Sequence, residues 1–246
     1  MAVVASLAFE SHFPFSDRIA QLLDRIDCRL AESEEDREAI FRLRYEAYRS
    51  EDAIAPNFTQ TFYDAYDDAE NVWLFGLYVD GDLASSIRLH VTSEVHRDFP
   101  SRHVFPDALE PELEAGKVII DPTRFVANRH SSRGNFGLTY ATVRLAWLAA
   151  GYFGADHLLA AVRAEHQAFY RRTFNHRLLC EPRPYPMLAK PISLMTVEHS
   201  SVADQVHRRY PFFRSTLFER RMLFERYPAM PQVVPANEAA EVHHAA

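Results

Sequence analysis

One apolar, strand-like run, residues 117–126, carries a carboxylate at Asp121 and a guanidinium at Arg124. A carboxylate in this place can accept a proton from a reacting group, directly or through water. The alternative is an ion pair between Asp121 and Arg124 that only fixes the strand. Pro122 lies between the two charges, and a central strand accommodates a proline only at a bulge. The run therefore predicts an irregular strand that could support acid–base chemistry.

A second set of charges lies earlier in the chain. Arg44 falls on a predicted helix with apolar residues on two faces, so it needs a carboxylate partner, for which Asp64 and Asp67 are the natural candidates. Arg88, at the end of a predicted hairpin, could bind a substrate carboxylate through two parallel hydrogen bonds. It could equally pair with Asp64 or Asp67 and pin the segment that carries them. The residues leave both roles open.

The elements that must position these side chains combine strands and helices. The residue patterns predict helices near 19–26 and over 34–49, 138–152 and 165–174, and strands over 27–31, 72–79, 83–91, 117–126, 157–162 and near 192–197. Residues 51–71 and 96–116 are predicted to be connecting loops, the second with one short helix. We therefore expect an α/β domain over residues 1–199, with a mixed central sheet flanked by helices.

The remaining chain differs in composition. Residues 200–226 combine apolar positions with arginines, a pattern typical of basic amphipathic helices. They predict a C-terminal extension over residues 200–227. This extension either docks on the domain or contacts a partner, and it could also make weak contact with a membrane surface. Residues 228–246 are predicted to be a disordered tail.

Composition excludes several classes of protein. The 246 residues include only 7 glycines, and none of them form a dinucleotide-binding or P-loop motif. Two cysteines, Cys28 and Cys180, and histidines without ligand spacing predict no metal site and a reducing, cytoplasmic location. We expect no transmembrane segment, because the longest uncharged apolar stretch is too short, and no nucleic-acid partner, because no stripe of basic and aromatic residues occurs.

The order of elements, with a proline-marked break in the fourth strand, resembles the GNAT superfamily of acyltransferases. The resemblance implies that strands four and five splay apart and that the acyl-pantetheine arm of the donor lies in the gap, near backbone donors that the bulge frees. Residues 167–174 look like a helix of that superfamily in which a tyrosine, here Tyr170, protonates the leaving thiolate. Residues 133–137 are a degenerate version of its phosphate loop. Arg129, Arg133 and Gly137 would bind the donor phosphopantetheine, and the alternative is that the two arginines are solvated loop residues.

Within that fold, residues 38–200 resemble the acyl-homoserine-lactone synthases and the related N-acyl amino acid synthases. The matching residues, in the order and spacing of the family, are Arg44 and Tyr48 in the first helix, Asp64 and Asp67 before a strand, Arg88 on the hairpin, and Asp121, Arg124 and Phe125 on the fourth strand. By this resemblance Asp121, Arg124 and Tyr170 are catalytic. The residues expected to bind substrate are Arg44, Tyr48, Asp64, Asp67, Arg88 and Phe125.

Two departures from the homoserine-lactone branch leave the acceptor open. No tryptophan follows the first-helix aromatic residue, and the acid on the fourth strand is Asp121 rather than Glu. Residues 182–188, ahead of 192–195, also look more like the N-acyl amino acid synthases. We therefore expect an enzyme that moves a fatty acyl group from acyl carrier protein, less readily from acyl-CoA, to the α-amine of an amino acid, with no tightly bound cofactor.

The charge distribution agrees with an acidic donor protein. Acidic residues outnumber basic ones in residues 1–70, whereas basic residues outnumber acidic ones in residues 122–226, so the second half could dock acyl carrier protein. Three alternatives remain: an acyl-homoserine-lactone synthase that uses S-adenosylmethionine, a general CoA-dependent N-acetyltransferase, and a non-catalytic acyl-binding module of the same fold.

Overall fold

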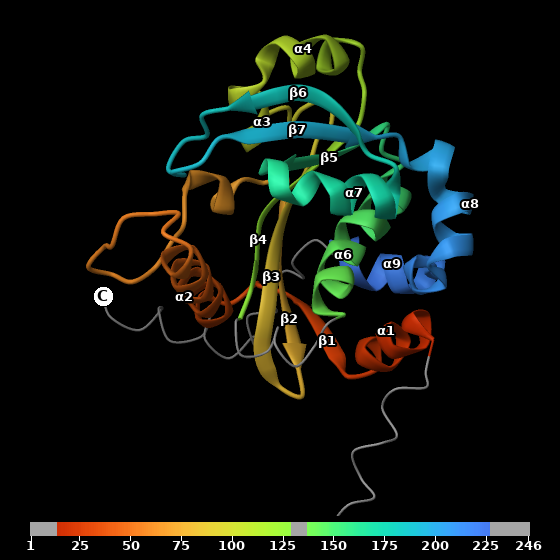
Figure 1. Ribbon diagram of the computed structural model, residues 1–246, viewed down its shortest axis with the longest axis horizontal. Helices are drawn as coiled ribbons and strands as arrows, with labels where there is room; N and C mark the ends of the chain where they lie inside the picture. Colours follow the sequence, from red (N-terminus) through yellow and green to blue (C-terminus); the bar gives the residue numbers. More distant parts are fainter. Residues whose placement is uncertain (1–13, 129–136, 227–246) are drawn as a thin grey trace, which may run out of the picture.

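A seven-stranded sheet forms the centre of the computed structural model, which describes residues 14–128 and 137–226 (Figure 1). Its strand order is β1-β2-β3-β4-β5-β7-β6. Neighbouring strands are antiparallel except for β4 and β5, which are parallel. The strands are β1 (Ile26–Leu30), β2 (Val72–Val79), β3 (Asp82–Val91), β4 (Ile119–Ala127), β5 (His157–Val162), β6 (Arg177–Arg183) and β7 (Ile192–Val197). The mixed sheet that the sequence predicts is confirmed.

Helices cover both faces of this sheet. They are α1 (Phe15–Leu23), α2 (Glu34–Ser50), α3 (Pro100–Val104), α4 (Pro106–Glu114), α6 (Leu138–Phe153), α7 (Gln167–Phe174), α8 (His199–Arg209) and α9 (Leu217–Phe224). Short 3-10 helices are η1 (Ala65–Asp68), η2 (Ala164–His166) and η3 (Pro211–Phe213). No helix of the described ranges is both long and apolar enough to cross a membrane.

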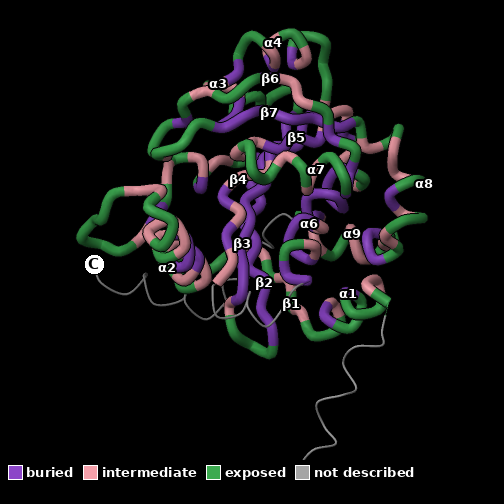
Figure 2. The backbone as a smooth tube through the Cα atoms, viewed as in Figure 1, coloured by how far each residue is buried: buried purple, intermediate pink, exposed green. Residues whose placement is uncertain are grey.

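The two faces have separate apolar cores. On one face, α2 packs on β2 through Ile40 and Leu74, while α3 and α4 pack on β4, β5 and β7. On the other face, α6 packs on β2 and β3 through Trp147, Phe75 and Ile87, and α1, α7, α8 and α9 surround it. Figure 2 shows that the strands and α6 are largely buried, whereas the outer sides of α2 and α8 are exposed.

Most expected elements form where the sequence places them. The helix capped by Ser33 begins at Glu34, because the Ser33 hydroxyl accepts a hydrogen bond from the amide of Asp36 (3.1 Å). Two expectations were incomplete. Residues 96–116 contain two helices, α3 and α4, rather than one, and β6 was not predicted, since its polar ending at 181–183 does not alternate as a strand usually does.

The parallel strands β4 and β5 pair at only two positions, Ile119 with His157 and Ile120 with Leu158, and then separate. The carbonyl of Val118 accepts a hydrogen bond from the amide of His157 (3.1 Å), so alternate residues of β4, including Pro122, turn their backbone groups toward β5. Pro122 has no N–H with which to continue this ladder. The splayed fourth and fifth strands that the family resemblance implies are thus confirmed, and the proline accounts for the point of separation.

A bulge follows directly in the same strand. Ser86 faces Val126 and Arg88 faces Thr123, so Arg124 and Phe125 together oppose the single residue Ile87 of β3. Arg124 has a positive φ of 54°, which costs a non-glycine residue about 1–2 kcal/mol. This left-handed backbone turns the Arg124 side chain away from the regular alternation of the strand.

The C-terminal helices pack directly on the α6 face. Phe213 is fully buried, with its ring centroid 4.9 Å from that of Phe174 and 6.1 Å from that of Trp147. Phe224 packs edge-on against Phe75 of the sheet at 5.8 Å. Residues 199–226 therefore contribute side chains to the same core as β2 and α6.

Replacing Phe213 by alanine should lower the free energy of unfolding by about 3–5 kcal/mol, because the large buried ring leaves a cavity among other aromatic rings. The matched control is Leu217→Ala, which truncates a 61% exposed side chain of α9 and should change stability by less than about 0.5 kcal/mol. Urea unfolding followed by circular dichroism measures both. Equal, small effects would show that the C-terminal helices unfold independently of the sheet.

Candidate active site

Five charged side chains from four elements form a buried cluster on the α2 face of the sheet. Arg44 of α2 donates to Asp67 (2.8 Å), and Arg88 of β3 pairs with both Asp67 (3.1 Å) and Asp64 (2.6 Å). Arg124 of β4 donates to the second oxygen of Asp64 (2.6 Å). Arg44, Asp67 and Arg88 are fully buried. The structure thus brings together five of the residues that the sequence selects.

Local backbone geometry explains the spacing of the two aspartates. They cap the short helix η1 reciprocally: the Asp64 carboxylate accepts from the amide of Tyr66 (3.0 Å), and the Asp67 carboxylate accepts from the amide of Asp64 (3.0 Å). Each carboxylate therefore uses one oxygen for the turn and presents its charge to the arginines. The capping box fixes both aspartates over β3 before any substrate binds.

The cluster holds its groups in their charged forms. Burial alone would raise the pKa of Asp64, but the hydrogen bonds and charges of Arg88 and Arg124 outweigh it and lower that pKa. The pKa of Asp67 is lowered in the same way by Arg44 and Arg88. Burial lowers the pKa of Arg44 to about 10, so this guanidinium remains protonated at neutral pH.

Arg88 has no donor nitrogen to spare for a ligand. Its Nε donates to the hydroxyl of Thr123 (3.0 Å), and Nη1 and Nη2 face Asp64 and Asp67. Arg124 differs, because its Nε is buried and makes no hydrogen bond to any described residue. The geometry therefore favours the pinning role for Arg88 and leaves Arg124, which lines the cavity described below, with an unpaired donor.

Asp121 faces away from this cluster toward α3. Its oxygens accept hydrogen bonds from the amide (3.0 Å) and the hydroxyl (2.7 Å) of Ser101, at the start of that helix. The ion pair of Arg124 is with Asp64, so the structure does not contain the Asp121–Arg124 ion pair considered from the sequence. Burial raises the pKa of Asp121 to about 6, although the two Ser101 hydrogen bonds oppose that shift.

A cavity of about 570 Å³ passes through the gap between β4 and β5. On the α2 side its wall includes Tyr48, Thr123, Arg124 and Tyr185. On the α6 and α7 side it is mainly apolar and is lined by Ile87, Val143, Ala146, Leu158, Phe169 and Phe174. Because the strands are separated here, a single ligand can extend from one face of the sheet to the other.

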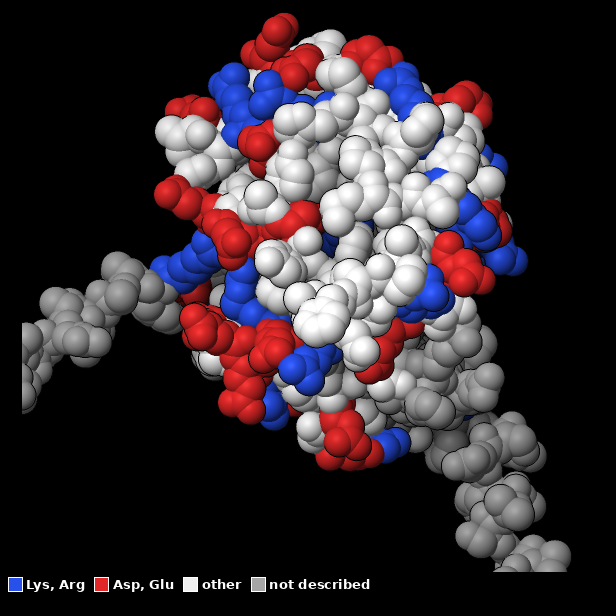
Figure 3. Space-filling model, turned by 90° about the vertical axis from the view of Figure 1, so that its left-hand side faces the viewer, with Lys and Arg blue, Asp and Glu red and all other residues white. Residues whose placement is uncertain are grey.

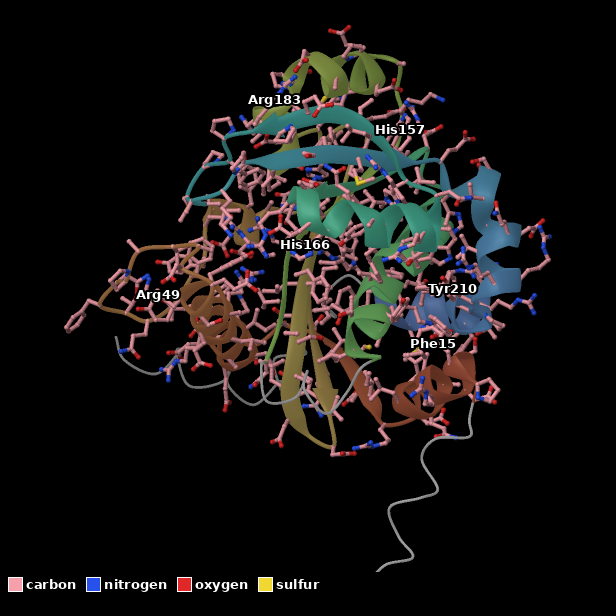
Figure 4. All side chains as sticks on the ribbon, viewed as in Figure 1. Phe15, Arg49, His157, His166, Arg183 and Tyr210 are labelled. Carbon is pink, nitrogen blue, oxygen red and sulfur yellow. The ribbon has the colours of Figure 1, made fainter. Side chains whose placement is uncertain are left out.

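The mouth of the cavity lies between the end of α2, the start of α7 and residues 185–190. Figure 3 shows the face that carries α2, where charged side chains of both signs surround a largely uncharged middle. Arg163 pairs with Glu51 (2.9 Å) and with His166 (2.9 Å), which ties the end of α2 to the start of α7. In Figure 4, His166 lies just before α7, at the end of that helix nearer to α2.

The other residues selected from the sequence divide into three groups. Tyr48, Phe125 and Tyr170 line the cavity, and burial raises the pKa of Tyr170 to about 12. Gly137 caps α6, and a Cβ there would lie 2.5 Å from the end of the Ile19 side chain, so packing of α1 favours a small residue at this position. Arg129 and Arg133 lie outside the described residues.

Several contacts of the site were not predicted. Phe62 lies 4.6 Å from the Arg124 guanidinium, Tyr185 lines the mouth, Ser101 binds Asp121, and His176 lines the apolar side. Tyr185 lies within residues 182–188, which the family resemblance selects as a stretch, whereas Phe62, Ser101 and His176 have no local sequence pattern that separates them from ordinary packing residues. Among residues 14–128 and 137–226, no group of three or more His, Cys, Asp or Glu side chains could hold a metal ion.

Comparison with known proteins agrees with this geometry. The family model of the N-acyl amino acid synthase FeeM matches residues 39–198, more than half of the chain. The solved structure of FeeM, from uncultured soil microbes, is 14% identical with a TM-score of 0.63, and the alignment covers 76% of this chain and 98% of that one. No curated protein matches the chain in sequence.

Two lactone synthases share the architecture. LasI, an acyl-homoserine-lactone synthase, is 14% identical with a TM-score of 0.54, over 71% of this chain and 90% of that one. BjaI, a CoA-dependent acyl-homoserine lactone synthase solved with MTA, is 16% identical with a TM-score of 0.53. The alignment covers 76% of this chain and 89% of that one. At these identities the structures establish the acyltransferase fold of the GNAT type. The family match establishes more: the chain belongs to the FeeM family of N-acyl amino acid synthases and is an N-acyltransferase.

Proposed function

We propose that this N-acyltransferase moves a fatty acyl group from acyl carrier protein to the α-amine of an amino acid. The observation that carries the proposal is the cavity through the gap between β4 and β5, apolar on one face of the sheet and bordered by a guanidinium on the other. An acyl chain suits the first side and an amino acid carboxylate suits the second. The thioester would then lie in the gap between them.

The gap also suits the pantetheine arm of the donor. Beyond Ile120, β4 and β5 no longer pair, so their facing backbone groups are available to the amides of the arm. Arg171 and Arg172 are exposed on α7, beside the cavity, and a basic surface attracts an acidic carrier protein. We retain the phosphate-binding role of Arg129, Arg133 and Gly137 as a prediction.

The acceptor would bind on the α2 side. Of the three guanidinium groups in the cluster, Arg124 is the one that lines the cavity, and its Nε has no partner among the described residues. A carboxylate placed there would receive a charge-assisted hydrogen bond. Tyr48, whose ring lies 6.0 Å from the same guanidinium, would border the acceptor side chain.

The reaction is aminolysis of a thioester, in which a C–N bond forms and a C–S bond breaks. The attacking amine loses a proton, the carbonyl oxygen becomes an oxyanion, and the sulfur leaves as a thiolate that takes up a proton. Backbone N–H groups at the bulge would stabilise the oxyanion, and the Tyr170 hydroxyl, protonated at neutral pH, would donate to the thiolate. Asp121 is not one of the described residues that line the cavity. It would therefore accept the amine proton through water or through the hydroxyl of the nearby Tyr185.

Two further proposals concern location. Cys28 and Cys180 are free thiols, which suits the reducing cytoplasm. Leu217, Phe218 and Met222 of α9 are exposed beside several arginines, a composition that suits weak contact with a membrane surface.

Purified protein incubated with acyl carrier proteins bearing chains of several lengths and a mixture of amino acids should release N-acyl amino acids, detected by mass spectrometry. The same chains on CoA should react more slowly, because CoA lacks the acidic protein surface. Lipid extracts of cells that overproduce the protein should contain the same products. The matched negative control is the Asp121→Asn/Arg124→Ala double variant.

Other outcomes would redirect the assignment. Acyl-homoserine lactones formed only with S-adenosylmethionine would select the lactone synthase reading. Transfer of an acetyl group alone from acetyl-CoA would indicate a general N-acetyltransferase. Binding of acyl chains without any product would indicate a binding module.

Replacing Arg124 by lysine should remove the preference for an amino acid over its decarboxylated amine. In the wild type this preference in kcat/KM should be roughly 10- to 100-fold, the worth of a charge-assisted hydrogen bond. Because partial unfolding lowers both rates equally, the ratio reports carboxylate binding rather than stability. An unchanged ratio in Arg124→Lys would show that another residue binds the carboxylate.

The kcat/KM of the wild type should rise with pH around pH 6, because the Asp121 carboxyl accepts a proton only when ionised and burial raises its pKa to about 6. Rates are compared at a constant concentration of unprotonated amine, which removes the titration of the acceptor. Asp121→Asn should abolish this rise and lower turnover roughly 100-fold.

Ser101→Ala provides the matched variant. It removes a hydrogen bond that favours the ionised carboxylate, so the rise should move to higher pH. If Asp121→Asn keeps both the wild-type turnover and the wild-type pH profile, Asp121 has only a structural role.

A further inference from the structure

A histidine borders the mainly apolar side of the cavity. Helix α7 ends at Phe174, and the capping residue Asn175, with a positive φ of 60°, reverses the chain, so that His176 turns back beneath the helix. The His176 side chain is buried, with the residue only 3% exposed, and it lines the cavity. Its ring meets those of Tyr170 and Phe174 edge-on, with centroids 5.5 and 5.9 Å apart. This position is therefore both deeply buried and open to a bound acyl chain.

The ring nitrogens of His176 lack hydrogen-bond partners of good geometry within the described residues. Burial lowers the pKa of His176 to about 3, and the nearby carbonyl of Leu158 opposes only part of this shift. The imidazole is therefore neutral at physiological pH. With its proton on the nitrogen nearer that carbonyl, the other nitrogen carries a lone pair and can accept a hydrogen bond.

An unpaired acceptor is costly in such a place. A buried polar group without a partner destabilises a protein by about 1–3 kcal/mol. The neighbouring wall is built from Phe169, Phe174 and Leu158, and an apolar side chain at position 176 would suit a plain hydrocarbon chain better. Since the His176 ring lines the cavity and both of its nitrogens lack partners within the described residues, a ligand group beside the ring can supply the missing donor.

We propose that His176 accepts a hydrogen bond from a hydroxyl group on the acyl chain, so that the preferred donors are β-hydroxyacyl thioesters. The position of the hydroxyl follows from Tyr170, which the proposed reaction places at the thioester sulfur. His176 contacts the Tyr170 ring, so it lies beside the first carbons of the chain beyond the carbonyl. This inference rests on the proposed function, because it names the acyl class of the same cavity.

The test compares two donors that differ by one oxygen, myristoyl and β-hydroxymyristoyl acyl carrier protein. The wild type should prefer the hydroxylated donor by about tenfold in kcat/KM, the value of one hydrogen bond. His176→Phe, which keeps the volume and aromatic contacts, should reduce the ratio to about one, while His176→Asn, which keeps an acceptor, should retain part of it. The control is His199→Phe, whose ring packs against Trp147 on α6 and should leave the ratio unchanged.

The outcomes separate this inference from the proposed function. Equal use of both donors by the wild type, or an unchanged ratio in His176→Phe, overturns the inference and leaves N-acyl transfer intact. If neither donor reacts, calorimetry with free myristic and β-hydroxymyristic acids decides. Tighter binding of the hydroxy acid that depends on His176 supports the inference while the proposed function fails, and equal binding overturns both.

Discussion

The separation of β4 from β5 is the constraint on which the rest of the structure depends. A parallel strand pair normally satisfies every facing amide, and Pro122 removes the donor at the position where the ladder would continue. The bulge at Arg124 and Phe125 then bends the strand further and leaves additional backbone groups unpaired. Such groups are costly without a partner, so the same irregularity that weakens the sheet creates a place for a ligand that supplies hydrogen bonds.

The buried charge cluster supports this irregular strand. Arg124 has an unfavourable backbone conformation, and its side chain is held by Asp64, which Arg88 and the capping turn of η1 hold in turn. Loss of one partner from such a buried pair typically costs about 3–5 kcal/mol, because a desolvated charge remains. The cluster therefore joins α2, η1, β3 and β4 through buried ion pairs.

The two faces of the sheet divide the chemistry between them. Charged and aromatic groups lie on the α2 face, where Arg124, Tyr48 and Tyr185 border the cavity. Apolar groups of α6 and α7 lie on the other face, and the C-terminal helices cover the outer side of α6 through Phe213 and Phe224. The gap between β4 and β5 connects the two sides, so one cavity contains both environments. His176 adds an unpaired imidazole to that mainly apolar side.

The sequence by itself determined the elements and the charged set. Periodicity located α2, the β2–β3 hairpin, β5 and β7, and the need of a buried guanidinium for a carboxylate linked Arg44 with Asp64 and Asp67, as the structure confirms through Asp67. The proline in an apolar run also indicated the bulge. Only the tertiary structure decided that Asp121 faces Ser101 rather than Arg124, that β6 forms an edge strand, and that His176 borders the cavity. These features depend on contacts between segments distant in the chain, which local residue patterns do not encode, whereas periodicity, capping and proline act within a few residues.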